Sequence, residues 1–302
     1  MGAASHVTLP ELQEPVKYCG RIFTPEEMAA IGGLIDDPRK LCRAALSREV
    51  CRMLAWRKPD GGLKDMSCRV AMLRMYRDGL IRLPAPRNRG PNGRTRPRLT
   101  SRSDPQAPVT ESAGRLGELK FVVASSKHGP SRLWNELVQR HHYLGYQPLP
   151  GAQMRYLVYS QDGRLLAALG FGAAAWKAAP RDTFIGWTHE QRKQRLHLIV
   201  NNARFLILPW VTSKNLASRI LSRTARFLGE QWEQRYGYRP VLLETFVETG
   251  RFHGTCYKAA NWTKVGRTQG RGKLDVHNEY ALPVKDIYVY PLQSGFRAHL
   301  CG

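Results

Sequence analysis

The chain has 302 residues, of which 42% are hydrophobic and 24% are charged. This length and apolar content exclude a disordered tail and are enough for two modest domains with buried cores. The 47 lysines and arginines outnumber the 24 aspartates and glutamates, which gives a net charge of +23. Because such a surplus of charge repels itself, we expect a polyanionic partner, and nucleic acid, above all DNA, fits that expectation.

Other classes of protein are disfavoured by the sequence. No apolar run approaches the roughly 18 residues of a membrane span, and the N-terminal residues lack a secretory pattern. The six cysteines have no metal-ligand spacing, so we expect reduced thiols and no structural zinc. We therefore expect a cytoplasmic protein that binds no membrane. No metal-ligating residues are predicted, and the sequence does not decide whether a divalent metal ion acts as a cofactor.

Composition divides the chain into three zones. Residues 1–86 have a net charge of +4, and residues 87–113, which are rich in Arg, Pro, Gly and Ser, also have +4. Residues 114–302 hold 27 basic and 12 acidic residues, a net charge of +15. We expect a helical DNA-binding domain, a flexible basic linker and an α/β domain, in that order.

The first zone predicts three helices. Thr24, Pro25 and Glu27 are typical of a capped helix start, and this helix is expected to end near Ile35. Two further helices follow, each with apolar residues near helical spacing. The residues expected to face the core are Leu41, Ala45, Val50 and Leu54 in the second helix and Met66, Val70, Leu73 and Leu80 in the third.

Three helices followed by a short strand, expected over residues 80–83, are typical of a winged helix-turn-helix. The third helix would then be the recognition helix in DNA. Its basic residues expected to contact DNA are Lys64, Arg69, Arg74 and Arg77. A generic three-helix bundle with a solvated basic face is the alternative.

The third zone predicts a mixed α/β domain. Helices are expected over 133–142, 191–198, 216–236 and 254–262, and strands over 154–159, 165–172, 205–211, 241–247 and 264–267. This order resembles the acetyltransferase fold of the GNAT superfamily, in which the pyrophosphate of acetyl-CoA lies at a helix start after the central strand. In residues 211–218 both small-residue positions of that family's phosphate-binding pattern are compromised, so acetyl-CoA is disfavoured and no cofactor is predicted.

Five residues of the α/β domain are candidate catalytic residues. Glu244 and Glu248 bracket the C-terminal end of a predicted strand, where α/β proteins place ligands, and Glu244 is the candidate acid, base or polarising group. Tyr257 is a candidate nucleophile toward phosphate. His142 is a candidate general base, with a capping or core role as the stronger alternative. Asn202 and Arg204, at the entrance of a predicted strand, complete the expected cleft.

Three residues of the same domain are expected to contact nucleic acid. Lys214 precedes the long predicted helix, whose first amide groups favour an anion. Arg271 and Lys273 lie in the glycine-containing segment 270–273, where the backbone can approach a phosphate. This segment lacks the spacing of a phosphate-binding P-loop.

Longer motifs resemble the family of the Druantia anti-phage protein DruA, over residues 132–293. The motifs are residues 141–145, 180–182, 185–187, 202–211, 244–247, 251–262 and 270–273. Residues 181, 182, 186 and 187 are expected to border the same cleft as the candidate catalytic residues. The resemblance implies a role in bacterial defence against phage, or carriage on mobile elements beside transposases.

Several functions are consistent with these observations. The first is a DNA-binding defence or mobile-element protein whose α/β domain is an enzyme acting on nucleic acid. A transposase or a transposon-associated strand-transfer protein is an alternative, as are a non-catalytic DNA-binding module and a GNAT-type acyltransferase. Other defence-system or transposon proteins are expected as partners besides DNA.

Overall fold

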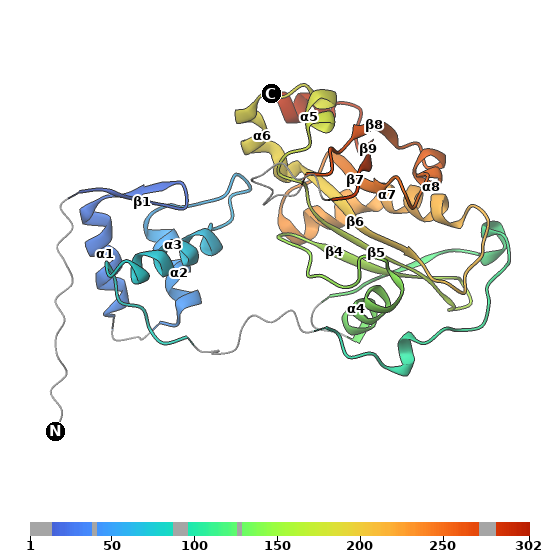
Figure 1. Cartoon of the computed structure of the whole chain (residues 1–302), viewed down its shortest axis with the longest axis horizontal. Coiled ribbons are helices and arrows are strands. Elements are labelled where there is room, and N and C mark those ends of the chain that lie inside the picture. Colours follow the sequence, from blue (N-terminus) through green and yellow to red (C-terminus); the bar gives the residue numbers. More distant parts are fainter. Residues whose placement is uncertain (1–13, 38–40, 87–95, 126–128, 272–281) are drawn as a thin grey trace. The chain divides into compact units, whose positions relative to one another are not determined.

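A computed structural model describes residues 14–37, 41–86, 96–125, 129–271 and 282–302 (Figure 1). Its internal contacts divide the chain into a first unit, Met1–Gly93, and a second unit, Arg94–Gly302. None of the helices in the described ranges is long and apolar enough to cross a membrane.

The first unit is a small helical domain with an N-terminal hairpin. Its elements are β1 (Val16–Tyr18), β2 (Arg21–Phe23), α1 (Pro25–Ile35), α2 (Arg43–Met53) and α3 (Asp65–Arg77). The predicted helix start is confirmed, because Thr24 Oγ1 accepts from the Glu27 amide at 3.3 Å and the Glu27 carboxylate accepts from the Thr24 amide at 3.3 Å. This capping box satisfies two amide groups that have no partner within the helix.

The predicted core face of the third helix is wrong. Met66 and Val70 are 61% and 40% exposed, whereas Cys68, Met72 and Met75 are buried. The buried residues follow the i, i+4, i+7 spacing of one helix face, and the expected set lies on the neighbouring face. The smaller Cys68 side chain therefore marks the core, and larger apolar residues beside it remain in solvent.

The winged helix-turn-helix prediction is not supported by the described part of the first unit. The expected strand over residues 80–83 is not formed there. The hairpin of β1 and β2 comes before the three helices, whereas a wing would follow the third. The three predicted helices themselves are confirmed.

Part of the predicted linker 87–113 belongs to the second unit and packs within it. Val109 is 1% exposed and its amide donates to the Trp210 carbonyl at 2.8 Å. The amide and hydroxyl of Thr100 donate to Glu136 at 2.9 and 2.7 Å. The segment from residue 96 onward thus finds backbone and carboxylate partners that its basic, proline-rich composition did not indicate, and residues 87–95 lie outside the described ranges.

The second unit is built on a mixed sheet with the strand order β3-β4-β5-β6-β7-β9-β8 in the described residues. The strands are β3 (Lys120–Val123), β4 (Met154–Tyr159), β5 (Leu165–Ala173), β6 (Ile199–Ile207), β7 (Leu242–Glu248), β8 (Thr263–Arg267) and β9 (Lys285–Pro291). β6 and β7 are parallel, and the other neighbouring pairs are antiparallel. The predicted mixed α/β architecture is confirmed.

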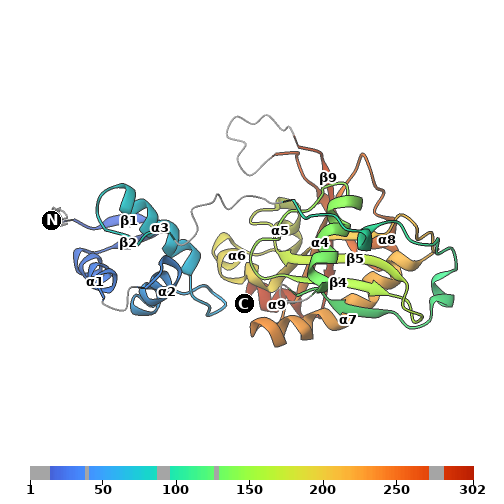
Figure 2. The same cartoon turned by 90° about the horizontal axis from the view of Figure 1, so that it is seen from below.

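The longer helices α4 and α7 cover opposite faces of this sheet (Figures 1 and 2). The helical segments are η1 (Ser101–Ser103), η2 (Ala113–Leu116), α4 (Gly129–His141), α5 (Ala179–Ile185), α6 (His189–Arg195), η3 (Leu196–Leu198), α7 (Leu216–Tyr236), α8 (Thr255–Ala259) and α9 (Phe296–Cys301). Successive residues of β4 face opposite ways. Arg155 donates to Asn135 of α4 at 2.7 Å, and Tyr156 donates to Gln231 of α7 at 2.9 Å.

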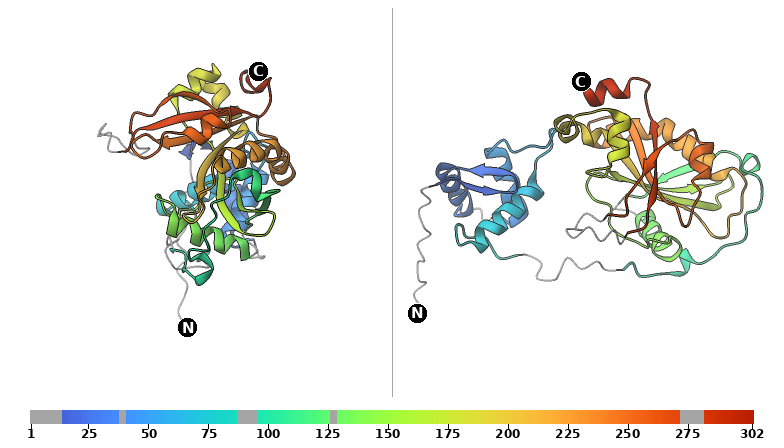
Figure 3. Two further views of the ribbon diagram at one scale, coloured as in Figure 1. Left: turned by 90° about the vertical axis from the view of Figure 1, so that its right-hand side faces the viewer. Right: turned by 45° about the horizontal axis from the view of Figure 1, so that its top comes forward.

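The sequence located these elements with unequal success. The long helix over 216–236 is confirmed, and it ends before Gly237, whose φ of +77° suits glycine. The strand expected over 205–211 instead spans Ile199–Ile207, so residues 202 and 204 lie inside it. Short helices that were not predicted, α5 and α9, pack with α6 around a second cluster of buried apolar residues near the C-terminus (Figure 3).

Candidate functional site

A cavity of about 580 Å³ lies where the parallel strands β6 and β7 separate. The two strands pair only from Ile199–Asn201 to Leu242–Glu244. Beyond these residues β6 and β7 no longer pair with each other, although β6 stays paired with β5 and β7 with β9. Residues of 202–207 and 245–247 supply much of the cavity wall. Ligand sites in α/β sheets lie at the carboxyl ends of strands, and cavities of about 300–1,000 Å³ hold small ligands.

An irregularity in β6 sets which side chains reach the cavity. Gly170 pairs with Arg204 and Phe171 pairs with Asn202, so Ala203 has no partner in β5. The extra residue reverses the alternation of faces, and Asn202 and Phe205 both line the cavity. Arg204 instead packs beside Gly170 on the face that α4 covers.

The cavity floor is a buried network of neutral polar groups. The Tyr257 hydroxyl donates to Asn202 Oδ1 at 2.8 Å, and the Thr245 hydroxyl donates to the Asn202 carbonyl at 3.0 Å. Asn202 Nδ2 donates to the Arg204 carbonyl at 3.2 Å. Burial raises the pKa of Tyr257, so its hydroxyl stays protonated and is committed to Asn202. The predicted tyrosine nucleophile therefore sits where a phenolate is disfavoured.

His142 is held neutral at the cavity wall. Burial and the positive charge of Arg204 lower its pKa to about 4. The Leu144 amide donates to its Nδ1 at 3.2 Å, which leaves the ring proton on Nε2 in the neutral form. His142 thus presents a hydrogen-bond donor to a ligand.

Glu244 does not belong to this cavity, which corrects the sequence prediction. Its carboxylate accepts from the Ala175 amide and from Arg181, each at 2.7 Å, and both charged side chains are fully buried. Alternation along β7 places Thr245 toward Asn202 and Glu244 on the other face. Burial raises the pKa of Glu244, and the Arg181 guanidinium opposes that shift.

The residues 181, 182 and 187 lie with Glu244 and not at the cavity. Asp182 accepts from Arg181 at 2.7 Å, from Arg192 at 3.2 Å and from the Trp187 indole at 3.1 Å. Two carboxylates and two guanidiniums therefore balance their charges in one buried cluster, which we call the ionic cluster. The cluster consists of Arg181, Asp182, Arg192 and Glu244.

Aromatic side chains dominate the cavity wall, and sequence reasoning missed most of them. The aromatic lining residues are Tyr143, Phe205, Phe246, Phe252 and Tyr257. The described residues that line the cavity include Arg251 and three histidines but no aspartate or glutamate. The sequence did contain a signal for them, because several of these aromatic residues are adjacent in sequence to the predicted polar site residues.

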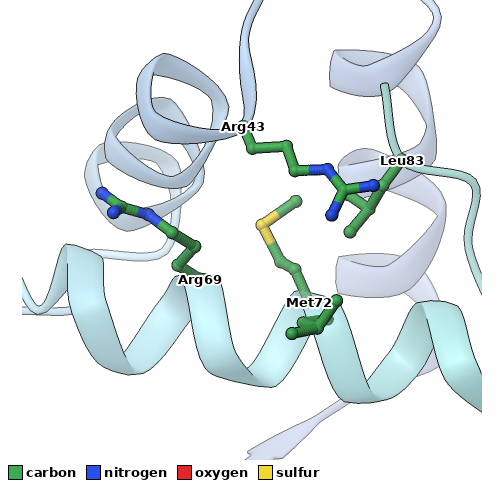
Figure 4. A pocket seen from close by; sticks show the side chains of 5 residues that line it. Arg43, Arg69, Met72 and Leu83 are labelled. Atoms are coloured by element: carbon green, nitrogen blue, oxygen red, sulfur yellow. The ribbon is translucent and has the colours of Figure 1, made fainter. Parts of the chain in front are cut away.

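The basic residues predicted to bind nucleic acid through the first unit have different settings. Lys64 is half-buried immediately before α3, and Arg74 is exposed. Arg69 donates to Asp65 at 3.3 Å and borders a cavity of about 120 Å³. Figure 4 shows its guanidinium directed away from Met72, on the same helix. This cavity is well below the volume that small ligands need.

In the second unit, Lys214 is exposed and lies two residues before α7, whose residue Ala217 lines the cavity. The first amide groups of a long helix favour an anion nearby. Arg271 is exposed, and Lys273 lies outside the described residues. No group of three or more His, Cys, Asp or Glu within the described ranges is placed to hold a metal ion.

Comparisons with known proteins identify one family and some distant likenesses. A family model described as Druantia protein DruA matches residues 74–281. No curated protein matches the chain.

Among solved structures, spermidine N-acetyltransferase from Vibrio cholerae in complex with CoA and spermine is 11% identical, with a TM-score of 0.39, covering 58% of this chain and 95% of that one. Spermidine/spermine N-acetyltransferase SpeG from Vibrio cholerae in complex with manganese ions is 10% identical, with a TM-score of 0.36, covering 58% and 93%.

Proposed function

The chain belongs to the Druantia protein DruA family, and on this premise we propose that it binds nucleic acid in bacterial defence against phage. The observation that carries the proposal is the cavity between β6 and β7. Its wall is aromatic, it contains an arginine, and none of the described residues that line it is an aspartate or glutamate. The zone from residue 114 onward holds a net charge of +15, which favours a polyanion at this domain itself.

The chemistry of the cavity favours binding over hydrolysis by paired carboxylates. Glu244, the acidic residue expected there, forms an ion pair with Arg181 on the other face of the sheet. The described lining offers neutral donors, aromatic faces and one cation, which suit a ligand that combines planar rings with negative charge. A nucleotide is such a ligand. Among the described lining residues, histidines, hydroxyls and the thiol of Cys256 are the groups that could take part in a reaction.

Binding to nucleic acid is tested by titrating the full chain with labelled DNA at several salt concentrations. We expect the affinity to fall steeply as salt rises, because lysines and arginines displace counterions from phosphate. Substitution of Lys214 by Glu should weaken binding, whereas substitution of the ion-paired Lys193 by Glu serves as a charge-matched control. Absence of binding at low salt, or an affinity that salt leaves unchanged, would contradict the proposal.

Its role in defence is tested by phage plating on bacteria that carry the wild type, Lys214→Glu or Lys193→Glu with the rest of the defence system. We expect protection to fall with DNA affinity. Full protection by a variant that no longer binds nucleic acid would separate defence from the proposed binding.

Acyl transfer is a second candidate, favoured by the position of the cavity between two parallel strands and beside the first turn of α7. The turn before this helix contains Asn215 with a φ of +66°, a conformation that glycine adopts more readily. A rise in melting temperature with acetyl-CoA, lost in a variant with a bulky residue at Ala217, would support this candidate. No rise would remove it.

A further inference from the structure

Two loops that are distant in sequence meet at the cavity through their aromatic residues. Tyr143 follows α4 and Phe252 follows β7, and their ring centroids are 5.4 Å apart at an interplanar angle of 58°. The Arg251 guanidinium lies 5.3 Å from the centre of the Tyr143 ring. These three side chains all line the cavity, and we call them the aromatic bridge.

The aromatic bridge is unusually open to solvent for a cluster of rings. Tyr143 is 38% exposed and Phe252 is 48% exposed, and the adjacent Leu144 is 42% exposed. Neither Tyr143 nor Phe252 is among the described residues that form the main buried apolar cluster of this unit or pack against it. Contiguous exposed apolar groups beside a cavity are typical of a binding surface.

The charges around the bridge favour a ligand with negative charge. Arg251 is 58% exposed, and its Nε donates to Glu248 at 3.0 Å, so this ion pair uses one of the five guanidinium N–H groups. Neutral His142 adds a hydrogen-bond donor, and none of the described residues that line the cavity carries a carboxylate. Aromatic rings with an arginine beside them bind nucleobases by stacking, whatever the base, while the cation attracts the phosphate.

Stacking on a protein ring requires that a face of the base be free. In duplex DNA both faces of each base are covered by neighbouring base pairs, so a base must be unpaired or extruded before it can stack on protein. The bridge stands at the wall of a cavity of about 580 Å³, which can accept such a base. A surface made for the duplex would instead present cations to the backbone without exposed rings.

We propose that the aromatic bridge of Tyr143, Arg251 and Phe252 stacks an unpaired nucleobase of single-stranded or locally opened nucleic acid and leads it into the cavity. This inference rests on the proposed function and names its substrate class. It assigns recognition of the base to residues 143 and 252, which were not among the site residues predicted from the sequence.

The experiment uses the full chain and a short DNA oligonucleotide with one 2-aminopurine. The same sequence is offered as a single strand, as a perfect duplex and as a duplex in which the 2-aminopurine is unpaired. We expect tighter binding and quenched fluorescence for the single strand and the unpaired base. Phe252→Ala and Phe252→Leu should each weaken these two complexes by about 5- to 150-fold, and Phe252→Tyr should retain binding.

Trp176 supplies a matched control in the same unit. It is 52% exposed and also has an arginine guanidinium over its ring, that of Arg192 at 5.7 Å, but it does not line the cavity. Trp176→Ala should leave all three affinities unchanged. Circular dichroism spectra of the variants check that each is folded.

The possible failures are distinguishable. If the chain binds all three DNA forms equally and Phe252→Ala matches the wild type, the stacking inference is wrong while nucleic-acid binding stands. If no form binds at low salt, the proposed function fails and the inference fails with it. An equal loss in Phe252→Ala and Trp176→Ala would also overturn the specific role of the bridge.

Discussion

Glu244 and Thr245 are neighbours on β7, yet they belong to two regions with opposite chemistry. On the Glu244 face, charged groups pair with one another in the ionic cluster, in which Arg181 and Glu244 are fully buried and Asp182 and Arg192 are largely buried. On the Thr245 face, neutral polar groups and aromatic rings border an open cavity. The difference shows that an acidic residue can serve in a buried ion pair while the neutral residue next to it lines the cavity.

The largest expected effect is on the ionic cluster. Arg181→Met should lower the free energy of unfolding by about 3–5 kcal/mol, because it leaves the buried Glu244 carboxylate without a counterion. That carboxyl would then hold a proton in the folded state at higher pH than in the unfolded state, so the defect should be larger at pH 8 than at pH 5. Urea unfolding followed by tryptophan fluorescence measures both, since six of the seven tryptophans lie in the second unit.

The double variant Arg181→Met, Glu244→Leu provides the control for this prediction. It removes both charges and should recover most of the lost stability. A single-variant loss below about 1 kcal/mol would contradict a structural role for the pair.

On the cavity side, Gly254 should be intolerant of a side chain. Its φ is +66°, and a Cβ there would lie 2.4 Å from the Tyr288 hydroxyl. Gly254→Ala should therefore cost about 2–4 kcal/mol, from backbone strain and from overlap. Gly237→Ala is the matched control, because Gly237 has a φ of +77° and no atom within 4 Å of its Cβ position, and it should cost about 1 kcal/mol. Equal costs would show that the close approach of Tyr288 is unimportant.

The polar floor of the cavity can be tested by removing one hydroxyl. Tyr257→Phe should destabilise the protein by about 1–3 kcal/mol, because Asn202 Oδ1 loses its donor in a buried place. Tyr288→Phe makes the same chemical change next to it, at a buried hydroxyl with no partner among the described residues, and should be close to neutral. Thermal unfolding of the two variants compares their stabilities. Similar losses of stability in both would argue against the hydrogen-bond network of Tyr257.

The smallest expected effect is the pH response of His142. Its pKa in the folded protein is about 4, below the ordinary value of 6.5, so the unfolded chain binds the proton more readily. The stabilisation is complete above pH 6.5 and is lost as the pH falls from there toward 4. His142→Gln should remove this part of the slope, on the order of 1–2 kcal/mol between pH 7 and 4.5. An unchanged slope in urea unfolding would show that His142 is not shielded.

The sequence predicted local structure well where the signal was local. The capping box at Thr24 and the amphipathic helix over 216–236 that ends before Gly237 have nearby causes, and both are confirmed. The core face of α3 was mistaken because the small Cys68 marks it, while larger apolar residues beside it are solvent-exposed. The family resemblance, carried by long motifs, is confirmed as well.

The site was harder to predict because it depends on pairing between distant strands. Asn202, Tyr257 and His142 were selected correctly as cavity residues. Glu244 could not be separated from them without knowing that β7 turns it toward Arg181, some sixty residues earlier in the chain. The irregular pairing that brings Phe205 to the cavity, and the contact between Tyr143 and Phe252, likewise exist only in the folded domain.

The most direct measurement of the central claim is photocrosslinking of the full chain to single-stranded DNA that carries one 5-iodouracil, with the crosslinked peptide identified by mass spectrometry. The account predicts crosslinks at Tyr143 or Phe252, which disappear when unlabelled single strand competes and persist when perfect duplex does. Crosslinks confined to residues outside the cavity would contradict it.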